Sequence, residues 1–307
     1  MKLRSLLFLP GNSPGMLLNG TVLEADALIL DLEDAVAPEQ KDAARKLLVE
    51  AMRSLDFGER KVVIRINACD TEFWEADLEA LVPLRPFAIM PPKVSSADYL
   101  QPLLERLDEL ENRHQIPLGS IQLIPLLETA AGVASAREIA LSSARNLALF
   151  LGAEDYTADI GASRTQGGAE IFLARSQIVL AAKSAGIGAI DTPFTDAQDL
   201  AGLKADAELA KSLGFTAKAS ISPHHLAGIH EVFSPKSEEI SYALEVLECL
   251  DRGIKAGQGA VSLRGKMIDK PIELRALRTL SMASDLGLLD AGQSKFFDEY
   301  QNEQLRS

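Results

Sequence analysis

The sequence has 307 residues, of which 47% are hydrophobic and 24% are charged, so it is long enough to bury a large core. Its formal net charge of −13 argues against general binding to nucleic acid or to anionic membranes, although a local basic pocket is compatible with it. The two cysteines, Cys69 and Cys249, have neither disulfide nor zinc spacing and favour a reducing compartment.

The N-terminal apolar run stops at Pro10 and Gly11, which is too early for a signal peptide. No run approaches the roughly 18–20 apolar residues of a membrane-spanning helix. We therefore expect a soluble, cytoplasmic protein.

Short apolar runs alternate with helical segments up to about residue 225. Fully apolar runs such as 147–151 are typical of strands that are buried on both faces in a parallel sheet. Strands are expected at 5–10, 27–34, 61–67, 87–93, 121–128, 147–151, 186–193 and 215–223. Helices between them are expected at 38–55, 71–82, 97–112, 171–184 and 197–213, with Lys41, Asp42, Arg45 and Lys46 pointing outward, and shorter helical segments after the first, fifth and eighth strands.

Eight such strand–helix units predict a (β/α)8 TIM barrel, because right-handed crossovers allow the sheet to close without edge strands. An open, doubly wound sheet is the alternative, but no glycine-rich nucleotide motif follows any strand. We expect a barrel catalytic domain at 1–235 and a helical arm at 236–307. Within the arm, helices are expected at 237–255 and 272–288, followed by a charged tail. The segment AGQGAVSLRGKMIDKP that joins the two helices is either a connector or an arm that closes over a site, in its own or in a neighbouring subunit.

Two consecutive predicted strands end in a carboxylate, at Glu128 and at Asp155, which are 155 − 128 = 27 positions apart. Functional residues of barrels gather at the carboxyl ends of the strands, so these two acids are expected to lie side by side there. Paired carboxylates suit Mg²⁺, which takes one or two protein oxygens and fills its other positions with water and substrate. Helix-capping or loop acids are an equally good interpretation of the position alone.

Arg65 lies between Ile64 and Ile66, so strand alternation predicts that it points into the top of the barrel. A buried arginine needs anionic partners, and Glu33, Asp34 or a substrate carboxylate would serve. Further residues are expected at the same mouth: Asn67, Lys93, Asp191, Ser222 and His224. His224 and His225 are expected to begin a helix rather than to bind a metal, because no second histidine lies at ligand spacing.

Nine segments, which span nearly the whole chain in order, resemble the citrate lyase beta subunit family within the wider group of HpcH/HpaI-type aldolases and acyl-CoA lyases. They are RSLLFLPGN, DALILDLEDAVAPEQKDAAR, VVIRIN, MPPK, PLLETAAG, LGAEDYTADIG, ARSQIVLAAKSAGIGAIDTPF, LGFTAKASISP and GKMIDKP. The resemblance implies a trimeric or hexameric TIM barrel and a Mg²⁺-dependent lyase. Such a lyase cleaves a 3-hydroxyacyl thioester into an acetyl or related acyl thioester and a 2-oxo acid.

The same resemblance assigns roles to residues of this sequence. It implies that Glu128 and Asp155 bind the metal and that Arg65 binds the oxo-acid portion. Asp269 of the GKMID segment is implied to be an acid/base that reaches in from a neighbouring subunit, with its pKa raised by burial next to Met267 and Ile268. The expected substrate-binding residues are Arg65, Glu128, Phe8, Ile221 and Ser222.

Departures from the family pattern leave the thioester carrier open. Ile221-Ser222-Pro223 replaces the Ile-His-Pro of many acyl-CoA lyases, Ala217-Lys218 replaces Gly-Lys, and the first loop lacks the lysines of some CoA-using members. We expect a citryl- or citramalyl-CoA type lyase that forms oxaloacetate or pyruvate. The alternatives are a citrate lyase beta subunit acting on a carrier-protein-bound citryl group, an aldolase acting on a free hydroxy-oxo acid, and a non-catalytic assembly subunit.

Overall fold

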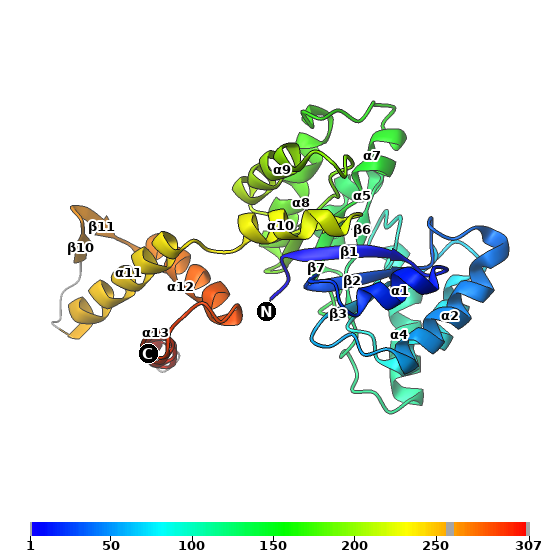
Figure 1. The fold of residues 1–307 in the computed structure, drawn as a ribbon, viewed down its shortest axis with the longest axis horizontal. Coiled ribbons are helices and arrows are strands. Elements are labelled where there is room, and N and C mark those ends of the chain that lie inside the picture. Colours follow the sequence, from blue (N-terminus) through cyan, green and yellow to red (C-terminus); the bar gives the residue numbers. More distant parts are fainter. Residues whose placement is uncertain (1, 256–260, 305–307) are drawn as a thin grey trace. The chain divides into compact units, whose positions relative to one another are not determined.

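The computed structural model describes residues 2–255 and 261–304. The chain divides into two compact units, which are described separately. One unit is Leu3–Phe233, here called the barrel unit, and the other combines Met1–Lys2 with Ser234–Ser307, here called the C-terminal unit (Figure 1). Within the described ranges, no helix is long and apolar enough to cross a membrane.

The barrel unit is built on one sheet of parallel strands. In sheet order these are β5 (Gln122–Leu123), β4 (Ala88–Met90), β3 (Lys61–Arg65), β2 (Ala27–Asp31), β1 (Ser5–Pro10), β9 (Ala217–Ser220), β8 (Gly188–Asp191), β7 (Ala148–Leu151) and β6 (Leu126–Leu127).

The two outermost strands of this sheet, β5 and β6, belong to one stretch of chain that is interrupted at Ile124 and Pro125. The Ile124 amide donates to Ile89 on one side, and the Pro125 carbonyl accepts from the Phe150 amide on the other, both at 3.0 Å. The sheet therefore closes on itself. Because β5 and β6 together occupy one strand position, the nine short strands fill 9 − 1 = 8 positions, and the predicted (β/α)8 barrel is confirmed.

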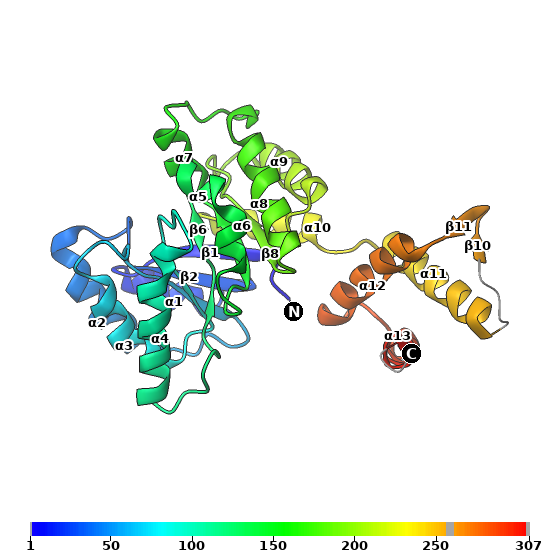
Figure 2. The ribbon, with the colours of Figure 1, turned by 180° about the vertical axis from the view of Figure 1, so that it is seen from behind.

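Helices surround the strands, as Figures 1 and 2 show from opposite sides. The α-helices of the barrel unit are α1 (Pro14–Gly20), α2 (Lys41–Ser54), α3 (Trp74–Leu81), α4 (Gln101–Arg113), α5 (Ala130–Ala134), α6 (Ala136–Leu141), α7 (Ala153–Asp159), α8 (Phe172–Ser184), α9 (Leu200–Leu213) and α10 (Leu226–Phe233). A 3₁₀ turn at Pro223–His225 precedes α10, so His224 and His225 do begin a helical segment.

Alternation along the strands separates two apolar layers. Ile29 and Val63 belong to the cluster inside the barrel, whereas Leu28 and Ile64 belong to the layer between strands and helices. Arg65 continues the inward series of Val63, as the sequence predicts.

The expectation that Asp191 faces the barrel mouth is wrong. Ala189 packs in the outer layer and Ile190 inside the barrel, so the period of two turns Asp191 outward towards α8 and α9. There its carboxylate accepts from Arg175 at 2.9 and 2.8 Å and from the Lys218 ammonium at 2.6 Å. Asp206 of α9 pairs with the same two cations, which completes a buried cluster of balanced charge.

The C-terminal unit has its own core, which includes Leu247, Leu280 and Phe297. Its helices are α11 (Ser237–Lys255), as predicted, α12 (Lys270–Asp285) and α13 (Ala291–Gln304), the last of which replaces the expected tail. The expected connector contains a hairpin of β10 (Val261–Leu263) and β11 (Lys266–Ile268), whose turn residues Arg264 and Gly265 have φ of 52° and 76°. Positive φ at both turn positions matches the twist of a tight hairpin. The first part of that connector, 256–260, lies outside the described residues.

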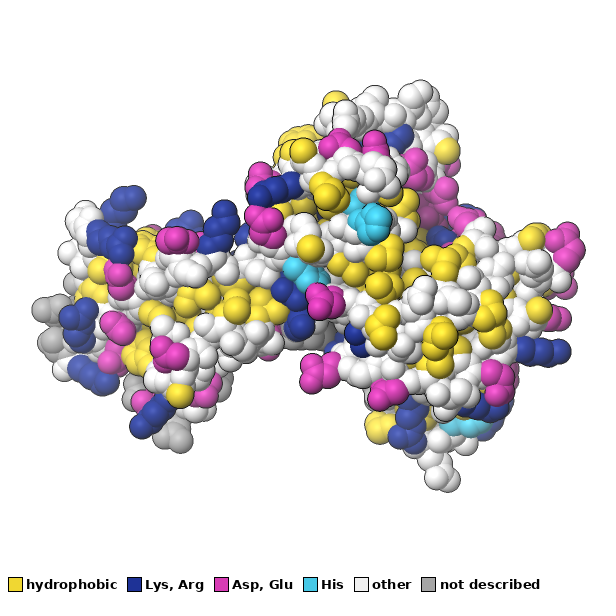
Figure 3. Space-filling model, viewed as in Figure 1, with side chains coloured by type: hydrophobic (Ala, Val, Ile, Leu, Met, Phe, Trp, Pro, Cys, Tyr) yellow, Lys and Arg dark blue, Asp and Glu magenta, His cyan; other side chains and the backbone are white. Residues whose placement is uncertain are grey.

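Acidic, basic and hydrophobic side chains are interspersed on the face shown in Figure 3. The charge of the barrel unit on this face is mixed and does not form one extended field.

Replacing Asp191 with alanine is expected to destabilise the protein by about 3–5 kcal/mol, because it leaves two buried cations with too little compensating charge. Urea unfolding followed by circular dichroism measures the loss. The control is Lys204→Ala, which breaks the exposed Lys204–Glu231 pair and should cost about 1 kcal/mol or less. Equal losses in the two variants would show that the buried cluster is not a main support of the fold.

Candidate active site

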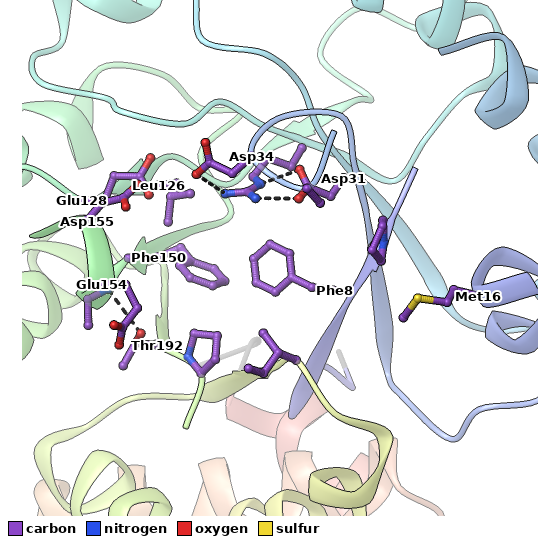
Figure 4. Close-up of a pocket in the computed structure, with 17 residues that line it drawn as sticks. Phe8, Met16, Asp31, Asp34, Leu126, Glu128, Phe150, Glu154, Asp155 and Thr192 are labelled. Carbon is purple, nitrogen blue, oxygen red and sulfur yellow. Dashed lines mark hydrogen bonds and ion pairs between the residues drawn. The ribbon is translucent and has the colours of Figure 1, made fainter. Parts of the chain in front are cut away.

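A pocket of about 350 Å³ opens at the carboxyl ends of the barrel strands (Figure 4). Its lining comes from segments at the ends of β1, β2, β3, β6, β7, β8 and β9, so residues far apart in the sequence meet there. The lining residues are Phe8, Pro10, Met16, Asp31, Asp34, Ala35, Arg65, Leu126, Glu128, Phe150, Gly152, Ala153, Glu154, Asp155, Thr192, Pro193 and Ile221.

Glu128 is held at the pocket wall by backbone geometry. Its Oε1 accepts from the Lys93 amide at 2.7 Å, and Lys93 has a φ of 55°, a left-handed conformation that is uncommon outside glycine. On the other side, a Cβ on Gly152 would lie 2.7 Å from Glu128 Oε2. Glycine at 152 therefore leaves the room that this carboxyl occupies.

The Glu128 carboxyl is buried without a salt bridge to a cation. Its pKa is raised to about 8, mainly by burial and also by the nearby carboxylates of Asp155 and Glu33, whereas the Lys93 amide and the charge of Arg65 act to lower it. No salt bridge joins Glu128 to a cation of the described residues. Asp155, in the first turn of α7, is half-buried and lines the same pocket. Two acids thus share one water-poor space, an arrangement that a bound cation would relieve.

These two carboxylates fit Mg²⁺. Within residues 2–255 and 261–304, no group of three or more His, Cys, Asp or Glu side chains is arranged to hold a metal ion. A closed zinc-type site needs such a group, whereas Mg²⁺ is commonly held by one or two carboxylates together with water and substrate oxygens. The pocket offers the second kind of donor set.

Arg65 is fixed by a partner that sequence reasoning missed. Its Nε and Nη2 donate to the two oxygens of Asp31 at 2.7 and 2.6 Å, its Nη1 lies 3.0 Å from Glu33, and its guanidinium lies over the Phe8 ring, 5.2 Å from the centroid. Burial alone would lower the pKa of Arg65, but the paired Asp31 raises it, so the guanidinium stays charged. The sequence did contain a signal for this partner. The run ALILD is apolar except for Asp31, which lies on the same side of the strand as Ile29.

Glu33, one of the partners expected for Arg65, does pair with it, and Lys93, expected at the same mouth, joins them. The Lys93 ammonium donates to Glu33 at 2.7 Å, and burial raises the pKa of Glu33 although Arg65 and Lys93 oppose it. Lys41, expected to point outward, is buried instead, and its ammonium donates to the carbonyl oxygens of Leu32 and Glu33. It thereby holds the strand end that carries Glu33.

The remaining expected residues are divided between the pocket and other parts of the barrel unit. Asn67 is turned towards α3, where its amide donates to Asp77 at 2.7 Å. Phe8 and Ile221 line the pocket, and Phe8 meets Phe150 edge to face at 6.0 Å. Ser222 is absent from the lining, and its hydroxyl accepts from the His224 amide.

Asp269 belongs to the C-terminal unit. Its side chain is exposed and caps α12 by accepting from the Ile272 amide at 3.1 Å. In this unit Ile268 is buried, whereas Met267 is 62% exposed.

Fold and pocket together define a TIM-barrel protein with an acidic pocket at the carboxyl ends of the strands. The family profile described as HpcH/HpaI aldolase/citrate lyase matches residues 4–223. The chain belongs to this family and is a lyase.

Two similar sequences and one similar structure illustrate this relationship. The citrate lyase subunit beta of Leuconostoc mesenteroides subsp. cremoris is 36% identical over 288 residues, which are 94% of this chain and 95% of that protein. The mitochondrial citramalyl-CoA lyase of Homo sapiens is 33% identical over 295 residues, covering 92% of this chain and 86% of that protein. The crystal structure of CitE from Mycobacterium tuberculosis in complex with magnesium, acetoacetate and coenzyme A has a TM-score of 0.73 at 33% identity, and covers 92% of this chain and 98% of that one.

The raised pKa of Glu128 predicts a pH-dependent effect of Glu128→Gln in metal-free protein. The folded state retains the proton up to about pH 8, whereas the unfolded chain loses it near its ordinary pKa, so ionisation of Glu128 costs stability increasingly as the pH rises between these values. The neutral variant should therefore melt at the wild-type temperature near pH 5 and above it at pH 8.

Thermal melts in EDTA at both pH values measure this difference, with the exposed Glu59→Gln as the control. A Glu128→Gln shift that does not change with pH would contradict the raised pKa.

Proposed function

We propose that this chain is a Mg²⁺-dependent carbon–carbon lyase that cleaves a carboxylated 3-hydroxyacyl thioester into an acetyl thioester and a 2-oxo acid. The observation that carries the proposal is the buried Glu128, which has no salt bridge among the described residues, beside Asp155 in a pocket that also presents Arg65. The named activities of the relatives, and the magnesium and coenzyme A bound to CitE, support it.

In the proposed reaction the bond between C2 and C3 breaks. The 3-hydroxyl loses its proton and becomes the carbonyl of the 2-oxo acid, while the electron pair of the broken bond passes to the thioester as its enolate, which then takes a proton at C2. A bound Mg²⁺ would supply Lewis acidity to the oxygens of the substrate. Glu128 and Asp155 would hold the ion, and Arg65, kept rigid by Asp31, would orient the substrate carboxylate.

The charges in the pocket favour a citramalyl over a citryl group. Arg65 is the one cationic side chain among the lining residues that the structure describes, and Asp31 already pairs with it. Next to Arg65 the wall is apolar, formed by Phe8, Leu126 and Phe150. A citramalyl group presents one free carboxylate and a methyl group, which matches this pairing. The second free carboxylate of a citryl group would meet no lining cation beyond Arg65, and burying it unpaired is costly. The proposed products are therefore an acetyl thioester and pyruvate.

We propose coenzyme A as the carrier, since one relative is named a citramalyl-CoA lyase and CitE binds coenzyme A. A carrier-protein-bound citryl group remains the second candidate, because the relatives include citrate lyase beta subunits. The cytoplasmic location remains a prediction.

Purified protein with Mg²⁺ should release pyruvate from citramalyl-CoA with a kcat/KM at least about tenfold above that for citryl-CoA or malyl-CoA. Glu128→Gln and Asp155→Asn should each abolish most of the activity, and EDTA should inactivate the wild type reversibly, because one carboxylate alone holds the ion poorly. A colorimetric assay of the 2-oxo acid measures all of these.

Faster cleavage of citryl-CoA would contradict the choice of acyl group. Full activity of both variants at low Mg²⁺ would contradict the metal assignment, and cleavage of no free CoA ester would favour the carrier-protein substrate.

We further propose that residues 236–307 form an arm which brings Asp269 to the pocket of a neighbouring subunit in a homotrimer or hexamer, where it would protonate C2. Asp269→Asn should be nearly inactive yet folded, because asparagine also caps helices well. Co-refolding it with inactive Asp155→Asn should restore a fraction of the activity, since some mixed interfaces would join an intact metal pair to an intact Asp269.

The control is Asp285→Asn at the other end of α12, which should remain active. Mixed oligomers that stay as inactive as their parents, or an active wild-type monomer, would show that Asp269 does not cross between subunits.

A further inference from the structure

The helix that carries Asp155 is too short to be stable without contacts to neighbouring segments. α7 spans Ala153–Asp159, seven residues, and its N-cap residue Gly152 has no side chain with which to cap it. Isolated helices of this length are not stable in water, so contacts with neighbouring segments must set the orientation of α7. At its first residue, the Ala153 amide lies 3.3 Å from the Thr192 hydroxyl, which accepts a long hydrogen bond.

The other end of α7 is joined directly to the segment that carries Glu128. Asp159 Oδ2 accepts a 2.7 Å hydrogen bond from the amide of Ala130, the first residue of α5 and two positions beyond Glu128. This amide is one of the first-turn donors that a helix cannot satisfy internally. The bond therefore links directly the two segments that carry the carboxylates. Along the covalent chain, these segments are separated by α5, α6 and β7.

Local contacts hold the segment at Ala130 in place. Thr129 caps α5 by accepting from the Gly132 amide, and a Cβ on Gly132 would lie 2.2 Å from the carbonyl oxygen of Val94. α5 thus sits against the chain that immediately follows Lys93, whose amide holds Glu128. A group attached to Ala130 is fixed relative to Glu128.

Asp159 follows Asp155 by four positions, so both project from the same face of α7. Burial of Ala153, Tyr156 and Thr157 packs α7 against the barrel unit, and the bond at Asp159 adds a constraint on the face that carries Asp155. We propose that Asp159 is a positioning residue, which sets the separation of Glu128 and Asp155 through its bond to the Ala130 amide. This inference rests on the proposed metal pair. Asp159 is exposed, and its role differs from that of a buried structural acid.

Two variants remove the same hydrogen bond from opposite sides. Asp159→Ala deletes the acceptor. Ala130→Pro deletes the donor without changing any charge, and proline suits this position because it is the first residue of a helix and Thr129 before it is extended, at φ −131° and ψ 156°. Asp159→Asn keeps an oxygen acceptor and removes only the charge. The control is Asp56→Ala, which removes an exposed carboxylate that likewise accepts from a backbone amide, that of Gly58, outside the pocket lining.

Isothermal titration of Mg²⁺ into each substrate-free protein, with melting temperatures to verify folding, tests the proposal. Asp159→Ala and Ala130→Pro should each weaken Mg²⁺ binding by about tenfold or more, and the double variant by no more than either single one, because all three lack the same bond. Asp159→Asn and Asp56→Ala should bind within about twofold of the wild type, and all variants should melt cooperatively.

Wild-type Mg²⁺ affinity in folded Ala130→Pro would overturn the proposal. So would equal losses in Asp159→Asn and Asp159→Ala, which would reveal an effect of charge rather than of the hydrogen bond. A different result, absence of Mg²⁺ binding by the wild type or unchanged binding by Asp155→Asn, would remove the metal pair itself and the positioning role with it.

Discussion

The site depends on one unfavourable burial. Glu128 is 3% exposed and has no salt bridge among the described residues, although burying an ionised carboxylate without a partner is costly. Backbone groups hold the carboxyl in this buried position. The amide of Lys93, a residue with left-handed backbone conformation, donates to it on one side, and Gly152 has no side chain to fill the space on the other. With Asp155 close by, the least costly way to keep both acids ionised is to bind a cation. The proposed metal site would thus follow from backbone groups at the strand ends.

The same pocket contains one cationic side chain among its described lining residues. Arg65 is also buried, but Asp31 and Glu33 neutralise it, and the fork of hydrogen bonds with Asp31 fixes its plane. A rigid guanidinium loses little freedom when it meets a substrate carboxylate. The pocket therefore combines two acids that have no salt bridge with one fixed positive charge, and the aromatic pair Phe8 and Phe150 lines the same space. Such a polarised space suits a short, carboxylated acyl group with one apolar substituent.

Periodicity in the sequence predicted the barrel, the inward direction of Arg65 and the arrival of Glu128 and Asp155 in one pocket. It failed where the outcome depended on tertiary pairing. Asp31 looked like an ordinary strand residue because nothing local shows that it pairs with Arg65, 34 positions away. Asp191 was misplaced because its strand is buried on both faces, so the sequence does not show that Ile190 points inward and Asp191 outward. Lys41 was assigned to the surface by charge, yet its ammonium is needed at two buried carbonyls. The hairpin at 261–268 escaped notice because its turn is Arg-Gly rather than the usual Asn-Gly.

If Glu128 and Asp155 together hold one divalent ion, crystals of the full chain soaked in Mn²⁺, which substitutes for Mg²⁺ and scatters anomalously, should show it. We expect one strong anomalous peak in the pocket, within bonding distance of one oxygen of Glu128 and one of Asp155, with water in the remaining positions. A peak bound to other residues, or a pocket in which neither carboxylate lies within bonding distance of the ion, would show that the two acids do not share a metal.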